Sequence, residues 1–260
     1  MKYATLTTSA VLIGSLALSA CGSSDPGGTR AGAAPKAFNF GDNTATYNAA
    51  NGSVSLDGTI VSQNGDQVNK ANGQANVTRS GNSIFFSSIA SDGATYAISS
   101  VSTSGAKRSG QIFGTNGISN APSNSFATYT GDYAGTITTT GASQTVTDTI
   151  TGDITIGANF DNNTFQGNIN NRQSFRTTGS QRGVGDTVGF SGRISSDLSF
   201  QGTASGGALT EGSRRYTGSN GLIRGVIGGD QGQSAAGVFE MDHTSGTTYT
   251  ERGAFVAGSN

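Results

Sequence analysis

Glycine interrupts the apolar face of nearly every strand-like segment in the second half of the chain. Apolar and polar residues alternate there with the two-residue period of a β-strand. Glycine usually weakens a strand, so its recurrence on the apolar face needs a structural reason. A small closed barrel provides one, because its strands bend sharply and its inward side chains alternate between large and small. Examples are Ile150, Gly152, Ile154 and Ile156, then Phe165, Gly167 and Ile169, then Val188, Phe190, Gly192 and Ile194.

The pattern predicts eight strands, an even number that lets an antiparallel up-and-down sheet close without a free edge. An open meander or a sandwich would show the same alternation. The stretches between strands at 171–185 and 206–218 are predicted to be long connections. The predicted strands cover about 129–139, 145–159, 163–170, 186–195, 198–205, 219–228, 235–242 and 247–257.

The first half of the mature chain is predicted to be a smaller β-rich domain at 37–120. Asn-Gly and Asp-Gly pairs, which favour tight turns, separate its short alternating runs. A linker at 121–128, containing Pro122, joins it to the barrel domain at 129–260. The predicted class is therefore all-β, with a C-terminal eight-stranded antiparallel up-and-down barrel preceded by a smaller β-rich domain.

The N-terminus is predicted to direct export and anchoring. Residues 1–20 combine Lys2, a short apolar run and small residues, as a secretory signal peptide does. Cys21 follows directly, and the segment resembles the lipobox of bacterial lipoproteins, in which this cysteine carries fatty acyl chains such as palmitate. The alternative is an ordinary cleaved signal beside a chance cysteine. Residues 21–36 are expected to be a flexible tether. In enteric lipoproteins a residue other than Asp after the cysteine, here Gly22, implies sorting to the outer membrane.

Composition excludes several classes of function. The 15 Lys and Arg against 16 Asp and Glu leave no basic excess for nucleic acid. One Cys and one His supply neither a disulfide scaffold nor a zinc site. A Ser-His-Asp triad would have to use His243, whose neighbour Asp242 is badly placed to orient the ring. No catalytic or metal residue is predicted, and polar outward positions favour a water-soluble barrel on a lipid tether.

The barrel segments are similar to the barrel of transferrin-binding protein B and its smaller relatives. The similarity covers about Tyr129 to Asn260, half of the chain, and includes the lipobox upstream. It corresponds to a single handle-plus-barrel unit, with 37–120 as the handle by position. The segments that carry it are Tyr129–Gly135, Gly152–Asn170, Gly189–Ile194, Phe200–Ala204, Gly221–Gly229, Ala235–Glu240 and Arg252–Ala257.

This resemblance implies a surface-exposed outer-membrane lipoprotein that binds an extracellular ligand through loops. Members of the family capture iron carriers, haemoglobin, haem or complement regulators, and the implied purpose here is nutrient uptake. Many are exported by a surface-lipoprotein translocon, and some pass their catch to a TonB-dependent transporter. The implied partners of this chain are thus membrane lipid through acylated Cys21, a protein ligand, a transporter and a translocon.

Two sets of residues are candidates for ligand binding. His243 is expected either in an exposed hairpin loop or as an axial haem ligand, with Tyr133, Tyr216 and Tyr249 as alternatives. Arginines in the two long connections would contact a protein or haem propionates, or would be solvated loop charges. They are Arg172, Arg176 and Arg182 in the first connection, and Arg214 and Arg215 in the second.

Three hypotheses from different classes follow. The first is a surface receptor for an iron-bearing or other protein ligand. The second is a small-ligand binder that holds haem in the handle or barrel. The third is a structural, adhesive or immune-shielding lipoprotein with no diffusible ligand.

Overall fold

The computed structural model describes residues 34–41, 45–48, 53–56, 59–62, 78–80, 83–90, 92–102, 109–139, 146–176 and 180–260. Every helix or strand in these ranges is a β-strand, and no helix long and apolar enough to cross a membrane occurs in them. The predicted signal peptide and Cys21 lie outside the described residues. The predicted all-β class is confirmed.

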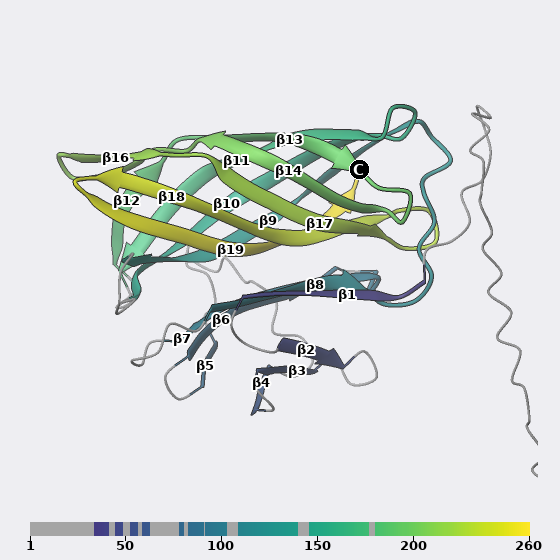
Figure 1. Ribbon diagram of the computed structural model, residues 1–260, viewed down its shortest axis with the longest axis horizontal. Helices are drawn as coiled ribbons and strands as arrows, with labels where there is room; N and C mark the ends of the chain where they lie inside the picture. Colours follow the sequence, from purple (N-terminus) through teal and green to yellow (C-terminus); the bar gives the residue numbers. More distant parts are fainter. Residues whose placement is uncertain are drawn as a thin grey trace, which may run out of the picture.

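Eight strands close into an antiparallel barrel, each pairing with the next one along the wall and the last pairing with the first (Figure 1). This confirms the predicted up-and-down barrel over the open meander or sandwich. In order around the wall they are β9 (Phe126–Thr139), β10 (Val146–Asn159), β11 (Thr164–Arg176), β13 (Val188–Ile194), β14 (Ser199–Gly206), β17 (Gly221–Gly228), β18 (Ser234–Ser245) and β19 (Thr247–Ser259).

Three neighbouring wall strands are interrupted and then continue to one end of the barrel. The continuations are β12 (Gln181–Gly185) before β13, β15 (Leu209–Glu211) after β14, and β16 (Arg214–Gly218) before β17. They complete the wall from β11 through β12, β15 and β16 to β18. The long connections predicted at 171–185 and 206–218 are therefore mostly strand, and that prediction was wrong.

Side chains fill the middle of the barrel. Aromatic rings from several strands meet there, including Phe165 and Phe200, whose ring centroids are 4.8 Å apart. Gly253 on β19 shows why a glycine lies on the inward face: a Cβ there would come within 2.4 Å of the Tyr133 ring. The absent side chain leaves the wall flat where a large ring lies against it, as expected from the large–small alternation.

A five-stranded sheet precedes the barrel, and we call it the handle sheet. Its order is β1 (Lys36–Gly41), β8 (Ser109–Thr115), β7 (Thr95–Ser102), β6 (Ser83–Ile89) and β5 (Thr78–Ser80). A separate three-stranded sheet consists of β2 (Ala45–Asn48), β3 (Ser53–Leu56) and β4 (Thr59–Ser62). In Figure 1 the handle sheet lies between the barrel and this smaller sheet.

The handle sheet packs on the outer wall of the barrel over β17, β18 and β19. Phe113 and Ala97 contact an apolar patch that includes Val238. The side-chain amide of Gln111 donates to the carbonyl oxygens of Phe239 and Gly253, each at 3.2 Å. Handle and barrel therefore share one apolar interface with polar contacts built into it.

Candidate functional site

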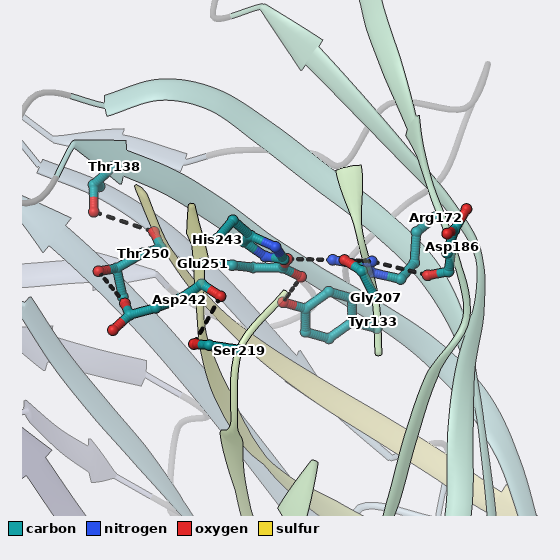
Figure 2. Close-up of polar contacts among 10 residues, drawn as sticks. All are labelled: Tyr133, Thr138, Arg172, Asp186, Gly207, Ser219, Asp242, His243, Thr250 and Glu251. Carbon is teal, nitrogen blue, oxygen red and sulfur yellow. Dashed lines mark hydrogen bonds and ion pairs between the residues drawn. The ribbon is translucent and has the colours of Figure 1, made fainter. Parts of the chain in front are cut away.

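Four polar side chains from four different strands meet inside the barrel (Figure 2). We call them the polar cluster: Tyr133 on β9, Arg172 on β11, His243 on β18 and Glu251 on β19. Arg172 and Glu251 are of residue types that are almost never fully buried without partners, yet all four side chains are buried. Such a cluster persists only if its members satisfy one another.

Glu251 is the centre of the polar cluster. One carboxylate oxygen accepts a hydrogen bond from the Tyr133 hydroxyl at 2.7 Å. The other accepts from Arg172 Nη2 and lies 2.7 Å from His243 Nε2. The carboxylate thus has three partners, one of them a guanidinium with no exposed side-chain area.

Strand periodicity explains why two members of the cluster point inward. Glu251 has the same parity along β19 as Tyr249, Gly253 and Phe255, so it must face the interior. His243 has the same parity along β18 as Phe239 and Met241. Both of these residues are buried, so His243 also faces the interior.

Arg172 points inward because β11 contains a bulge. The pairing of β10 with β11 shifts between Thr151 and Asp153. Opposite this shift, Asn171 takes a left-handed backbone conformation with φ of 50°, which asparagine tolerates better than most residues. Its side-chain amide donates to Asp153 Oδ2 at 2.6 Å. The extra residue resets the alternation and turns Arg172 toward Glu251.

Arg172 also spans the interruptions in the wall. Its Nη1 donates to the carbonyl oxygens of Asp186, between β12 and β13, and of Gly207, between β14 and β15, each at 2.9 Å. The amides at the same two positions still bond across the gap, Asp186 to Ala208 O at 2.7 Å and Gly207 to Thr187 O at 3.0 Å. One guanidinium therefore joins Glu251 to carbonyl groups at two strand breaks.

The electrostatics of the cluster keep Glu251 ionised. Burial opposes the charged carboxylate, but the charge of Arg172 and the hydrogen bonds from His243 and Tyr133 outweigh it and lower the pKa of Glu251 to about 2. Burial, and then the neighbouring Glu251 charge, raise the pKa of Tyr133 well above its usual value. Tyr133 is thus a fixed donor and Glu251 a fixed acceptor.

A small pocket opens between the polar cluster and the end of the barrel formed by β12, β15 and β16. We call it the mouth pocket. It comprises about 230 Å³ that protein atoms do not fill, part of it open to solvent. Its lining consists of Ile137, Asp148, Arg182, Leu209, Glu211, Tyr216, His243 and Tyr249.

Charged residues form the rim of the mouth pocket. Arg182 on β12 donates to both oxygens of Asp148, at 3.1 and 2.9 Å, and its Nε lies 2.9 Å from Glu211 Oε2. Burial disfavours the charge on Arg182, but Asp148 and Glu211 outweigh this and raise its pKa. Burial, together with the Asp148 charge, raises the pKa of Glu211 although Arg182 offsets part of the effect.

The structure corrects the expected positions of two candidate binding residues. His243 was expected in an exposed hairpin loop, but it lies within β18 and is fully buried against Glu251. Arg172 was expected in a long connection, but it lies within β11 and is also fully buried. Both face the interior, so neither is a surface contact for a protein ligand.

The other candidate arginines do not form one group. Arg182 lies at the rim of the mouth pocket, whereas Arg176 at the end of β11 is exposed. Arg214 and Arg215 lie on β16 and are exposed, and Arg215 donates to Asp186 Oδ2 at 2.5 Å. Of the five, Arg182 belongs to the lining of the mouth pocket, and Arg172 belongs to the polar cluster.

Sequence reasoning missed the acidic partners Glu251, Asp148 and Glu211. A signal for Glu251 was present, because it has the same parity as the apolar residues of its own strand. Asp148 likewise has the same parity along its strand as the apolar residue Ile150. Glu211 carried no such signal, because its strand is only three residues long.

A haem does not fit the arrangement around His243. The Nε2 atom of this histidine contacts Glu251, and the closed part of the mouth pocket has room for a group of about the size of one water molecule. Among the described residues, no three His, Cys, Asp or Glu side chains gather as a metal site does. The lining of the pocket combines the charged rim with two tyrosines.

Comparisons with known proteins show which solved structures the fold resembles. No family model and no curated protein matches the chain. Intact Ap-TbpB, with its N and C lobes, is 12% identical with a TM-score of 0.52, over 87% of this chain and 46% of that one. TbpB of isotype 1 from serogroup B Neisseria meningitidis is 12% identical with a TM-score of 0.49, over 87% and 43%. A TbpB point mutant from Haemophilus parasuis Hp5 is 11% identical with a TM-score of 0.49, over 87% and 45%.

This chain therefore spans under half the length of the TbpB structures that it matches. The likeness to Ap-TbpB covers both the handle sheet and the barrel, since it extends over 87% of the chain. The expected resemblance is confirmed at the level of architecture: the chain has a TbpB-like handle-and-barrel fold.

Proposed function

We propose that this protein is a surface lipoprotein of the outer membrane that captures an extracellular protein ligand. Acylated Cys21 holds it on the membrane, and the handle and barrel ends present the binding surface. The observation that carries the proposal is the handle-and-barrel fold shared with Ap-TbpB. Ap-TbpB is named for transferrin binding, so iron-carrier proteins are the first class of ligand that we would test.

The filled interior supports capture at the surface over capture inside the barrel. Phe165, Phe200, Phe239 and Phe255 all belong to one buried core, so side chains of the described residues fill the middle of the barrel. A protein partner must then bind at the ends or the outer face, where loops on a rigid scaffold usually carry binding residues. Export by a translocon and delivery to a TonB-dependent transporter are the partner steps that this function implies.

The proposal is tested on intact cells. Fluorescently labelled iron-loaded transferrin and haemoglobin are added to cells that produce the wild-type protein, to a deletion strain and to cells that produce Cys21→Ser. We expect wild-type cells to retain at least one carrier and the two other strains to lose that retention. Protease treatment of intact wild-type cells should also remove the protein.

Two results would overturn this function. One is equal retention of both carriers by wild-type and deletion cells. The other is a deletion strain with unchanged carrier binding but impaired adhesion, which would assign the protein an adhesive role instead.

A further inference from the structure

The interruptions in three wall strands lie side by side. They are residues 186–187, 207–208 and 219–220. On one side of the first two interruptions, Gly185 pairs with Leu209. On the other side, Val188 pairs with Gly206. These two interruptions are therefore direct neighbours in the wall.

The third interruption and a bulge extend this row to four strands. Gly218, next to the third interruption, lies against Gly206, because a Cβ at Gly218 would come within 2.0 Å of the Gly206 carbonyl oxygen. The bulge at Asn171 on β11 directly precedes Arg172, which pairs with Gly185 beside the first interruption. We call this row of three interruptions and one bulge the hinge line.

The backbone on the hinge line has conformations that suit a hinge. Asn171, Gly206 and Gly207 have φ of 50°, 84° and 70°, in the left-handed region that glycine and asparagine adopt most readily. Hinges in proteins are usually a few residues at the ends of elements that absorb changes of φ and ψ. Each strand crosses the hinge line where regular pairing is already interrupted or shifted.

The strands beyond the hinge line, β12, β15 and β16, form a short sheet at one end of the barrel, which we call the flap (Figure 1). In the part of the chain that the structure describes, β16 joins β18 only through the pairs Thr217–Thr244 and Gly218–His243. By contrast, β17 pairs with β18 along nearly its whole length. The seam between the flap and β18 is therefore short.

The flap also buries little apolar surface. Leu209 and Tyr216 are its buried side chains among the described residues, whereas Val184 is exposed. Parts of a protein with few buried apolar contacts open at a lower free energy than the whole. Separation of the flap should thus cost less than unfolding of the barrel, whose middle is filled with aromatic rings.

The mouth pocket lies between the flap and the wall that faces it. Half of its lining comes from the flap, and half comes from β9, β10, β18 and β19. The flap half is Arg182, Leu209, Glu211 and Tyr216, and the wall half is Ile137, Asp148, His243 and Tyr249. Side chains leave space between the two halves, so dispersion contacts there are fewer than in a filled core. The incomplete packing falls where the flap would part from the wall.

An ion pair fastens the flap to the facing wall. Arg182 on β12 donates to both carboxylate oxygens of Asp148 on β10. The Asp148 side chain is only 1% exposed, so the two charges attract each other more strongly than they would in water. Closure of the flap therefore gives the buried carboxylate a charged partner.

We propose that the flap swings away from the wall as one unit about the hinge line, while the rest of the barrel stays folded. The seam between β16 and β18 parts, and the pair of Arg182 with Asp148 is the latch that holds the flap closed. Opening turns the mouth pocket into a cleft that admits water to the His243 ring. This motion belongs to the barrel alone and does not depend on which ligand the protein captures.

Amide hydrogen exchange of the purified full-length protein tests whether the flap opens separately. We expect the hydrogen-bonded amides of β12, β15 and β16 to exchange at least about a hundredfold faster than those of β13, β14 and β17. They should share one opening free energy. Urea should change it less than it changes the free energy of global unfolding, because opening exposes less surface. The same exchange rates and urea dependence in both sets of strands would overturn the proposal.

A reversible disulfide across the seam tests whether the flap moves as one unit. In a Cys21→Ser background, Thr217→Cys with Thr244→Cys places two thiols at paired, exposed positions. We expect oxidation to slow exchange at least about tenfold in all three flap strands, and reduction to restore it. The matched control is Ser191→Cys with Thr203→Cys, an exposed pair between β13 and β14, whose disulfide should leave flap exchange unchanged. Slowing confined to β16 would show that the strands fray singly, against the proposal.

Arg182→Met tests the latch. Without the guanidinium, the Asp148 carboxylate is better solvated when the flap is open, so we expect flap amides to exchange about tenfold faster than in wild type. Arg214→Met is the matched control, because it replaces an exposed arginine of the same flap, and its exchange should stay within about twofold of wild type. Equal flap exchange in the two variants would overturn the assignment of the latch.

Discussion

At the scale of single residues, the balance of charge inside the barrel depends on Glu251. Arg172 is fully buried beside it, and removing one partner of a buried pair leaves the other charge uncompensated. We expect Glu251→Gln to lower the free energy of unfolding by about 3–5 kcal/mol, measured by urea denaturation. Glu240→Gln is the matched control. Glu240 pairs with Arg252 at 2.5 Å, but its own side chain is 44% exposed. Its effect should stay below about 1 kcal/mol.

The dependence of the unfolding free energy on pH separates this charge effect from a loss of packing. The pKa of Glu251 falls from 4.5 to about 2 on folding, so its stabilisation is present above pH 4.5 and is lost as the pH falls toward 2. The difference in unfolding free energy between wild type and Glu251→Gln should shrink over that window. Asp197, whose pKa is also about 2, is present in both proteins and cancels. A difference that stays constant from pH 7 to pH 2 would contradict the electrostatic account.

The polar cluster was only partly accessible to prediction. The alternation that places Tyr249, Gly253 and Phe255 inward also places Glu251 inward, so this position could be predicted. His243 could not, since Asp242–Gly246 has the composition of a turn, and the strand extends through it only because residues 242–245 of β18 pair with residues 247–250 of β19. The inward direction of Arg172 depends on the bulge at Asn171, because a shift of one residue moves every later side chain to the opposite face of the strand.

At the scale of secondary-structure elements, the interrupted strands depend on backbone conformation at the gaps. Gly207 has φ of +70°, and a Cβ there would lie 2.4 Å from Val188 Cγ2. Its carbonyl oxygen accepts from Arg172. Gly207→Ala would therefore combine backbone strain with a steric clash at this junction, and we expect a loss of about 2–4 kcal/mol of unfolding free energy.

The matched control is Gly189→Ala on β13, because no atom lies within 4 Å of a Cβ built at that position. Its stability should remain within about 1 kcal/mol of wild type. Urea denaturation of both variants checks the pair. Equal stabilities would mean that the backbone at Gly207 adjusts and that the gap geometry is not fixed by the glycine.

The strands were predictable where the alternation of apolar and polar residues extends over many residues. The eight predicted strands match wall strands because each contains several inward apolar residues. Strands β12, β15 and β16 were missed because they are three to five residues long and consist largely of Gly, Thr and Arg. Hydrogen bonding to neighbouring strands across the wall, and not local composition, makes these segments extended.

At the scale of the whole molecule, the apolar contact of the handle sheet with the barrel makes the two parts stabilise each other. Val226, Ala236, Val238 and Ala254 on the outer wall form one buried cluster with Ala97 and Phe113 of the handle. Such a patch would be exposed if the two parts separated, and exposed apolar patches carry a cost in water. We therefore infer that handle and barrel unfold together in the wild-type protein.

Val238→Asp tests this inference, because it places a carboxylate in the apolar cluster that includes Phe113 and changes no residue of the core inside the barrel. We expect a loss of about 2–4 kcal/mol in unfolding free energy. Hydrogen exchange in urea should show β7 and β19 opening together in wild type and β7 opening first in the variant. Val184→Asp is the control, since Val184 is 52% exposed on β12, and it should behave as wild type. If β7 and β19 still open together at the wild-type midpoint in Val238→Asp, the interface does not couple the two parts.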